Sequence, residues 1–346
     1  MHRPASDFEQ RIYPPQTIAA IIAELGKDGI RAAAALEGTG LAEAQLPNHT
    51  TKISYSQIDR VIRNALRLSS DPTIAFRAGQ HMHVSAYGMY GYALLSSTTV
   101  AEAIEFAERY LRVHGPFCRM AVSRDADEVV YLLHPMYWPD PAEDTHRFAV
   151  EFALAAYLTS LRDLTAQAFR FSRVALAYPA PRHVGAYRSL LDCPLLFDQR
   201  ENEIHYAASW GDMSLALADP RSHAMARETC ERLLGEVNRA GGVATDIRRI
   251  LIEQPGQYPN IESIAARLEM HPRALRRRLE AEQTSYRDLL AEVRARLAIE
   301  YLRTTHMTNE EIASRLGYSD AANFRHAFTR WTGKSPSDFR SAERSA

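Results

Sequence analysis

The chain has 346 residues, of which 46% are hydrophobic and 24% charged, and its formal net charge is −1 at pH 7. This length accommodates two domains, and the ordinary apolar content argues against a chain that is disordered throughout. The three cysteines, Cys118, Cys193 and Cys230, are odd in number and far apart, which argues against a disulfide framework or a cysteine-rich zinc site. No apolar run reaches the ~18 residues of a membrane-spanning helix, so we expect a cytoplasmic protein without membrane contact.

The first 220 residues mix helical and strand patterns. Three amphipathic helices are predicted early in the chain, opened by Pro14-Pro15, by Ser54 and by Thr98 or Thr99. Two short β-favouring runs, over 117–122 and 129–133, are separated by polar residues typical of a hairpin turn.

Further elements complete this part of the chain. We expect a long helix over 143–167, strands over 171–178 and 203–206, and a short helix near 184–191. Together these elements predict an α+β domain over residues 14–220.

Residues 221–244 are predicted to join this domain to the next. A helix is expected over 222–238, and Ala240-Gly241-Gly242 is the clearest linker signal in the chain. The domain that follows, over 245–341, is predicted to be all helix. It is also the basic part of the chain, because residues 245–346 carry 17 Lys and Arg against 14 Asp and Glu.

This C-terminal part contains an internal repeat. Glu-Ser-Ile-Ala-Ala-Arg-Leu at 262–268 recurs as Glu-Glu-Ile-Ala-Ser-Arg-Leu at 310–316. A turn and a second amphipathic segment follow each copy, so we predict two helix-turn-helix units, at about 261–282 and about 309–331. The helix between them, over 286–303, is ~27 Å long at ~1.5 Å per residue, comparable with the ~34 Å between successive major-groove faces of DNA.

The second helix of each unit has one core face and one free face. Leu275 and Leu279, and likewise Phe324 and Phe328, are four residues apart and predict the core faces. The free faces carry residue types that hydrogen-bond base edges in the major groove: Arg273, Arg276 and Arg277 in the first unit, and Asn323, Arg325 and His326 in the second. Double-stranded promoter DNA is therefore the expected partner.

The run from Gly317 to Arg340 contains Gly-Tyr-Ser-Asp, two phenylalanines four apart, Gly-Lys-Ser-Pro and Asp-Phe-Arg. It resembles the signature of the AraC/XylS family of bacterial transcription regulators. Residues 88–103 and 198–204 resemble the arabinose-binding-like N-terminal domain of the subgroup that includes ornithine-utilisation regulators. The resemblance implies an effector-sensing, dimerising N-terminal domain and recruitment of RNA polymerase. It also places three arginines (Arg273, Arg276, Arg277) and a second set (Ala322, Arg325, His326) at base-facing positions.

The effector site is less well defined by the sequence. Aromatic residues that could line an apolar pocket are Tyr87, Tyr90, Tyr92, Phe106 and Tyr110. The predicted effector-binding residues are Tyr90, Arg119, Tyr131 and His134. The last three lie on or beside the predicted hairpin and could supply polar contacts to an acidic effector.

No catalytic residue, cofactor or metal is expected. His81 and His83 alternate without neighbouring Cys or carboxylate ligands, and neither a nucleophile elbow nor a phosphate-binding loop is present. The predicted function is a homodimeric, effector-responsive activator of a metabolic or catabolic operon. The alternative is a ligand-independent DNA-binding regulator whose N-terminal domain only dimerises or binds a protein partner.

Overall fold

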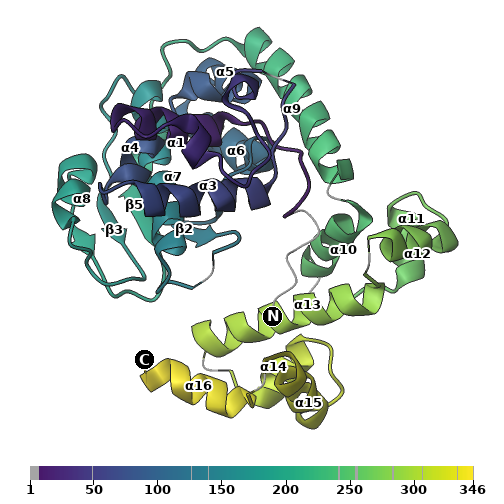
Figure 1. Ribbon diagram of the computed structural model, residues 1–346. Helices are drawn as coiled ribbons and strands as arrows, with labels where there is room; N and C mark the ends of the chain where they lie inside the picture. The colour runs from purple at the N-terminus through teal and green to yellow at the C-terminus, as the bar shows by residue number, and fades with distance from the viewer. Residues whose placement is uncertain are drawn as a thin grey trace. The chain divides into compact units, whose positions relative to one another are not determined.

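The computed structural model describes residues 8–345 apart from residues 49, 126, 139, 241, 254, 255, 283, 306 and 333. The chain divides into two compact units, an N-terminal unit over Phe8–Val237 and a C-terminal unit that begins at Asn238 (Figure 1). The first is α+β and the second is all helix, so the predicted fold class is confirmed. Residues 221–237, which the sequence assigns to a joining segment, belong to the N-terminal unit.

The N-terminal unit is mainly helical. Its helices are α1 (Gln16–Lys27), α2 (Ala32–Ala35), α3 (Tyr55–Leu68), α4 (Ile74–Gln80), α5 (Met89–Ser96), α6 (Val100–Tyr110), α7 (Asp144–Leu164), α8 (Val184–Leu191) and α9 (Pro220–Ala240). Short 3-10 turns lie between them: η1 (Glu43–Gln45), η2 (Val84–Tyr87), η3 (Leu111–His114) and η4 (Ala208–Asp212).

Side chains at the helix ends explain several boundaries. Ser54 caps α3 by accepting a hydrogen bond from the Gln57 amide, and Thr99, rather than Thr98, caps α6 by accepting one from the Glu102 amide. The long predicted helix over 143–167 ends earlier, at Leu164, because Ala166 and Gln167 adopt left-handed backbone conformations with φ of 48° and 68°.

One mixed sheet with strand order β1-β2-β5-β3-β4 completes this unit. The strands are β1 (Cys118–Arg124), β2 (Glu128–Pro135), β3 (Arg173–Ala175), β4 (Leu195–Leu196) and β5 (Glu203–Ala207). β1 and β2 form the predicted antiparallel hairpin, and only the β3–β4 pair is parallel among the described strands. The strand predicted over 171–178 is shorter, and β4 was not predicted.

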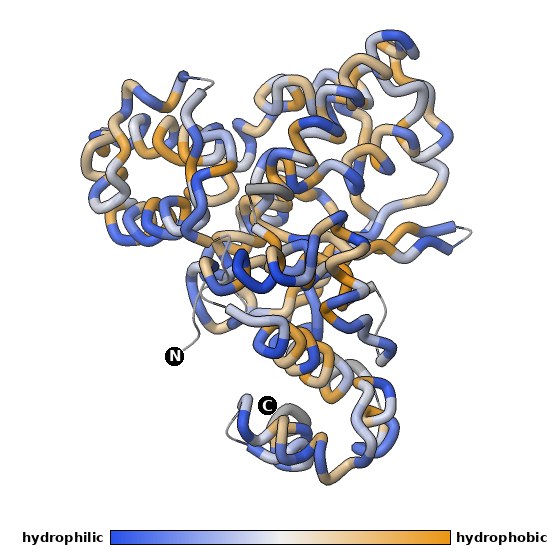
Figure 2. Tube along the Cα trace, turned by 90° about the vertical axis from the view of Figure 1, so that its right-hand side faces the viewer, coloured by the Kyte–Doolittle hydropathy of each residue, from blue (hydrophilic) through white to orange (hydrophobic). Residues whose placement is uncertain are grey.

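Helix α7 is central to the packing of this unit. It contacts β1 and β2 and also α3 and α4, so it lies between the sheet and the other helices. Its buried residues include Phe148, Leu154 and Leu158. In Figure 2 apolar and polar residues alternate along the helices of both units, as amphipathic helices require.

The C-terminal unit contains both predicted helix-turn-helix pairs. Its helices are α10 (Gly242–Glu253), α11 (Ile261–Arg267), α12 (Pro272–Ala281), α13 (Tyr286–Thr304), α14 (Asn309–Arg315), α15 (Ala321–Thr332) and α16 (Pro336–Ser345). Leu275, Leu279, Phe324 and Phe328 share one buried core, as their spacing predicts. No helix in the described parts of either unit is long and apolar enough to cross a bilayer.

Candidate nucleic-acid interface and effector cavity

Helix α12 presents three arginines to solvent. Its N-terminus is capped by the His271 side chain, which accepts a hydrogen bond from the Arg273 amide at 3.2 Å. Leu275 and Leu279 are 0% and 1% exposed and fix the inward face. Arg273, Arg276 and Arg277 are all exposed on the remaining surface, so the predicted donor-rich face exists in the folded chain.

One of these arginines has a partner within the unit. Arg276 Nη2 lies 2.6 Å from a carboxylate oxygen of Glu262 on α11. The side chains are 52% and 55% exposed, so solvent screens the attraction and the pair can be exchanged for another acceptor.

Helix α15 presents a sparser face. Phe324 and Phe328 are fully buried, whereas Ala322, Asn323, Arg325 and His326 are exposed. The amide of the Asn323 side chain donates to Asp320 at 2.8 Å and to Ser319 at 3.0 Å, and Asp320 in turn accepts from the Asn323 backbone amide at 2.7 Å. The structure therefore places Asn323 in the cap of α15, where its side-chain donors already have local acceptors.

A clamp at Arg294, on α13, connects the two helix-turn-helix pairs. Its guanidinium lies 5.0 Å from the Tyr258 ring centre and 4.6 Å from that of Tyr318, and it donates to the Gly317 carbonyl at 3.1 Å. Gly317 has a φ of +68°, and a Cβ there would lie 2.8 Å from the Gly256 carbonyl oxygen. This clamp, which the sequence did not predict, joins the loop before α11 and the turn between α14 and α15 to helix α13.

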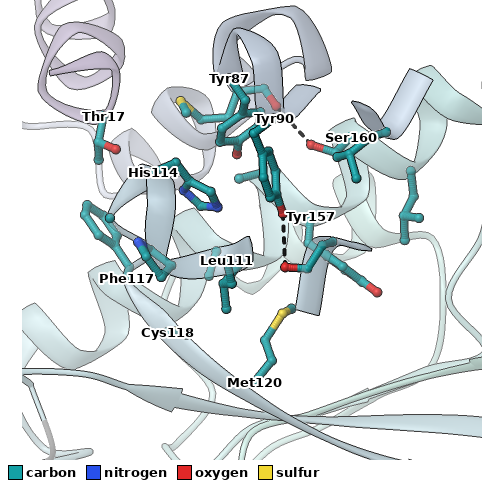
Figure 3. Close-up of a pocket in the computed structure, with 18 of the residues that line it drawn as sticks. Thr17, Tyr87, Tyr90, Leu111, His114, Phe117, Cys118, Met120, Tyr157 and Ser160 are labelled. Carbon is teal, nitrogen blue, oxygen red and sulfur yellow. Dashed lines mark hydrogen bonds between the residues drawn. The ribbon is translucent and has the colours of Figure 1, made fainter. Parts of the chain in front are cut away.

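The N-terminal unit contains an apolar cavity of about 100 Å³. Its wall is built from α5, α6, η3, β1 and α7, with further residues from α1 and the α4–η2 region. Figure 3 shows the side chains of Tyr87, Tyr90, His114, Phe117 and Met120 around it. A partly open apolar space with aromatic walls is typical of a small-molecule site.

The polar groups on this wall are few and uncharged. The Tyr90 hydroxyl donates to the Ala107 carbonyl at 3.4 Å, and the Tyr87 hydroxyl is hydrogen-bonded to Ser160 (Figure 3). The His114 ring lies between the two tyrosines, with centroid distances of 4.8 and 4.9 Å. Burial lowers the pKa of His114 to about 4, so the imidazole is neutral at physiological pH.

The structure does not bring the four proposed effector residues together. Tyr90 lines the cavity, but Arg119 and His134 are partners across the β1–β2 pair and point to the opposite side of the sheet from Met120. Tyr131 is buried and donates to the Glu108 carboxylate, and it is not among the residues that line the cavity. The three hairpin residues therefore do not form one pocket with Tyr90.

The five aromatic residues considered for a pocket divide into two groups. Tyr87 and Tyr90 line the cavity, whereas Tyr92, Phe106 and Tyr110 contact α9. The sequence reasoning missed His114, for which no periodic signal exists because it lies in a short 3-10 turn.

Helix α9 packs on the helices that form the cavity wall. Tyr92 of α5 donates to Ser222 at 2.9 Å, and Tyr110 of α6 donates to Glu231 at 2.9 Å. His223 Nδ1 lies 3.0 Å from the Ala93 carbonyl oxygen. Helices α5 and α6 thus contribute side chains both to the cavity and to α9.

The histidines considered for a metal have other partners. His81 pairs with Glu24, and His83 Nδ1 lies 2.9 Å from an Asp163 carboxylate oxygen. Among the residues that the structure describes, no group of three or more His, Cys, Asp or Glu side chains could hold a metal ion.

Paired helix-turn-helix units with exposed basic helices, next to an α+β unit with an apolar cavity, define a DNA-binding transcription regulator. The arabinose-binding domain of AraC transcription regulators matches residues 29–215, and a helix-turn-helix domain matches residues 264–342. The ornithine utilization regulator of Pseudomonas aeruginosa is 32% identical over 337 residues, which are 97% of this chain and 98% of that protein. The chain therefore belongs to the AraC family of transcription regulators.

Other relatives are also transcription regulators. VqsM of Pseudomonas aeruginosa is 29% identical over 271 residues, which are 76% of this chain and 82% of that protein. The crystal structure of CdpR from the same organism has 26% identity and a TM-score of 0.49, and the match covers 94% of this chain and 98% of that one.

Proposed function

We propose that this chain is a sequence-specific, effector-responsive activator of a metabolic or catabolic operon, which acts as a homodimer and recruits RNA polymerase at promoter DNA. The observation that carries the proposal is the exposed row of Arg273, Arg276 and Arg277 on α12. Leu275 and Leu279, which are buried on the opposite face, fix the orientation of this helix. The name of the relative involved in ornithine utilization favours a metabolic target.

The two reading helices are proposed to have unequal roles. Helix α12 offers three guanidinium groups, which can pair bidentately with guanine. Helix α15 offers the Ala322 methyl group, Arg325 and His326, while the Asn323 amide caps its own helix. We therefore expect α12 to set most of the sequence preference and α15 mainly to fix the position of the unit on DNA.

Effector response is proposed to pass through α9. A ligand in the cavity contacts α5 and α6, and these helices hold α9 through Tyr92 and Tyr110. The chain continues from α9 directly into the C-terminal unit. A ligand that binds one arrangement of α5, α6 and α9 better than another shifts the population of DNA-binding states.

An exposed apolar patch supports self-association. On α5, Met89 is 38% exposed and Tyr92 46% exposed. Leu217, just before α9, is 66% exposed, and Met225 on α9 is 68% exposed. The Tyr92–Ser222 hydrogen bond places the two helices side by side at this point. Exposed apolar side chains on neighbouring helices, such as Tyr92 on α5 and Met225 on α9, are suited to a protein interaction site.

The same patch also favours the alternative, in which the N-terminal unit only dimerises or binds a protein partner. Thermal-shift screening of the full chain against amino acids, sugars and aromatic compounds separates the two functions. Failure of every class of compound, with operator binding intact, would support the alternative.

Operator selection from random DNA by the full chain tests the DNA-reading proposal. We expect enrichment of a defined site, and a binding constant for that site whose logarithm falls linearly with the logarithm of the salt concentration. Equal affinity for the selected site and for unselected DNA of the same length would reject a sequence-specific function.

A further inference from the structure

We infer that the cavity of the N-terminal unit binds a small uncharged molecule, built on one ring or a short hydrocarbon chain with a single hydrogen-bonding group, and that it excludes free amino acids and sugars. This inference rests on the proposed effector response and names the chemical class of the effector.

Charged side chains are absent from the described residues of the cavity wall. Among the described residues that line the cavity there is no Asp, Glu, Lys or Arg. His114, which is the one lining side chain that titrates near neutrality in free solution, is kept neutral by burial. A ligand carboxylate or ammonium would lose its hydration without gaining an ionic partner, and this cost is large for an unpaired buried charge.

Apolar side chains make up most of the cavity wall, and its polar side chains are Thr17, Tyr87, Tyr90, His114, Tyr157 and Ser160. The hydroxyls of Tyr90 and Ser160 already have acceptors, the Ala107 and Met82 carbonyls, at 3.4 and 3.3 Å. These long hydrogen bonds can be exchanged for a ligand group. A neutral imidazole adds one donor and one acceptor. Such a wall can satisfy a ligand hydroxyl or amide, whereas several of the hydroxyls of a sugar would face apolar side chains.

The size of the cavity limits the ligand. Its volume is about 100 Å³, and an apolar cavity of about 150 Å³ is known to take benzene. Met82 and Met120 are on the wall, and flexible thioether side chains can move to enlarge such a space. The space is smaller than the one that holds benzene, so a single ring with a small substituent fits only after such side chains move, and a larger ligand would require rearrangement of the helices.

Isothermal titration of the full chain with matched probes tests this inference. Benzamide and benzyl alcohol are the uncharged probes, benzoate is the charged isostere of benzamide, and L-ornithine and L-arabinose represent amino acids and sugars. We expect both uncharged probes to bind and benzoate to bind at least about 100-fold more weakly, because its charge is left unpaired. No binding of the uncharged probes, or equal binding of benzamide and benzoate, would overturn the inference.

Two variants assign binding to this cavity. Ala107→Leu fills it from α6, whereas Ala101→Leu adds the same volume at an exposed position of that helix and serves as the control. Tyr90→Phe removes a hydroxyl without adding volume, and we expect it to weaken benzyl alcohol binding by about tenfold. Binding that survives both Ala107→Leu and Tyr90→Phe unchanged would contradict the site.

Operator binding by the unmodified chain is measured in the same preparations with and without ligand. Its absence under both conditions would count against the proposed function, whereas operator binding with no uncharged ligand bound would overturn the present inference alone. Ornithine or arabinose binding that Ala107→Leu abolishes would replace the uncharged class with a polar one.

Discussion

Arg276 differs from the neighbouring arginines of α12 because Glu262 already holds its guanidinium, at 2.6 Å. An exposed pair of this kind contributes roughly 0 to 1 kcal/mol to stability. Guanine offers two acceptors in the major groove, so DNA can displace the Glu262 carboxylate at little cost. The pair restricts the side chain before binding without preventing a base contact.

Replacing Arg276 with Ala should weaken operator binding by roughly 1 to 3 kcal/mol and relax base preference, because one bidentate contact is lost. The measurement is the Kd for the selected operator and for random DNA of equal length, at one salt concentration. Arg278→Ala is the control on the same helix. Arg278 is exposed but is turned ~100° from Arg277 by the helix step, so we expect at most a phosphate contact and a similar loss on both DNAs. An equal loss on both DNAs for Arg276→Ala would reject base reading.

His114 should make the N-terminal unit sensitive to acid. Its pKa is lowered to about 4 by burial, against about 6.5 in an unfolded chain. Between these two pKa values the unfolded state binds more protons than the folded state. The contribution of His114 to the free energy of unfolding is therefore fully present above about pH 6.5. It falls on acidification by at most about 1.4 kcal/mol per pH unit.

The His114→Gln variant tests this by urea unfolding between pH 4.5 and 8. The stability advantage of the unmodified chain over the variant should shrink as the pH falls below about 6.5. Above pH 7 the difference should be constant. Parallel profiles across the whole range would show that His114 does not titrate as its burial requires.

At the scale of elements, the sequence predicted those helices in which a capping residue directly precedes a run of apolar residues with helical spacing. Ser54 and the α3 apolar residues show this agreement, as do Thr99 and α6. Helix α5 was missed because Met-Tyr-Gly-Tyr-Ala-Leu-Leu-Ser is apolar on most sides and therefore lacks a helical period. Its packing depends on Gly91, where a Cβ would lie 1.8 Å from the Val84 carbonyl oxygen.

The two candidate sites also differ in how far the sequence could predict them. The arginine face could be predicted because its members lie on one helix at spacings of three and four residues. The cavity could not, since its wall joins residues as distant as Thr17 and Leu164. Tertiary packing alone brings His114 between Tyr87 and Tyr90.

The close approach of Gly317 to Gly256 makes Gly317 sensitive to substitution. We expect Gly317→Ala to destabilise the C-terminal unit by roughly 2 kcal/mol or more, because a left-handed backbone and a 2.8 Å contact both disfavour a Cβ. Gly185→Ala is the control, since the space around Gly185 is open and its helix tolerates Ala. Thermal unfolding of both variants measures the difference, and an unchanged melting temperature for Gly317→Ala would contradict the clamp at Arg294.

At the scale of the whole molecule, α9 has two proposed roles, in self-association and in transmission of the ligand signal. Met225 is 68% exposed on this helix, and Met225→Lys should shift the chain from dimer to monomer in sedimentation equilibrium. Leu196→Lys, at an exposed apolar position on β4, is the matched control and should leave the dimer intact. Equal effects of the two substitutions would remove the patch from the dimer interface.

Signal transmission is tested at the two hydroxyls that join α9 to the cavity helices. The double variant Tyr92→Phe and Tyr110→Phe removes the hydrogen bonds to Ser222 and Glu231 without altering the cavity wall. We expect benzyl alcohol to bind this variant as before while its effect on operator affinity falls to less than half. Tyr131→Phe, which removes a hydroxyl bound to Glu108 instead, is the control.

Thermodynamic linkage makes this prediction testable in both directions. If α9 carries the coupling, operator DNA must change the benzyl alcohol affinity by the same factor as benzyl alcohol changes the operator affinity, in the unmodified chain and in each variant. Both factors should therefore fall together in the double variant. A variant that keeps the full coupling factor would show that the ligand acts on the C-terminal unit by a route other than the Tyr92 and Tyr110 contacts with α9.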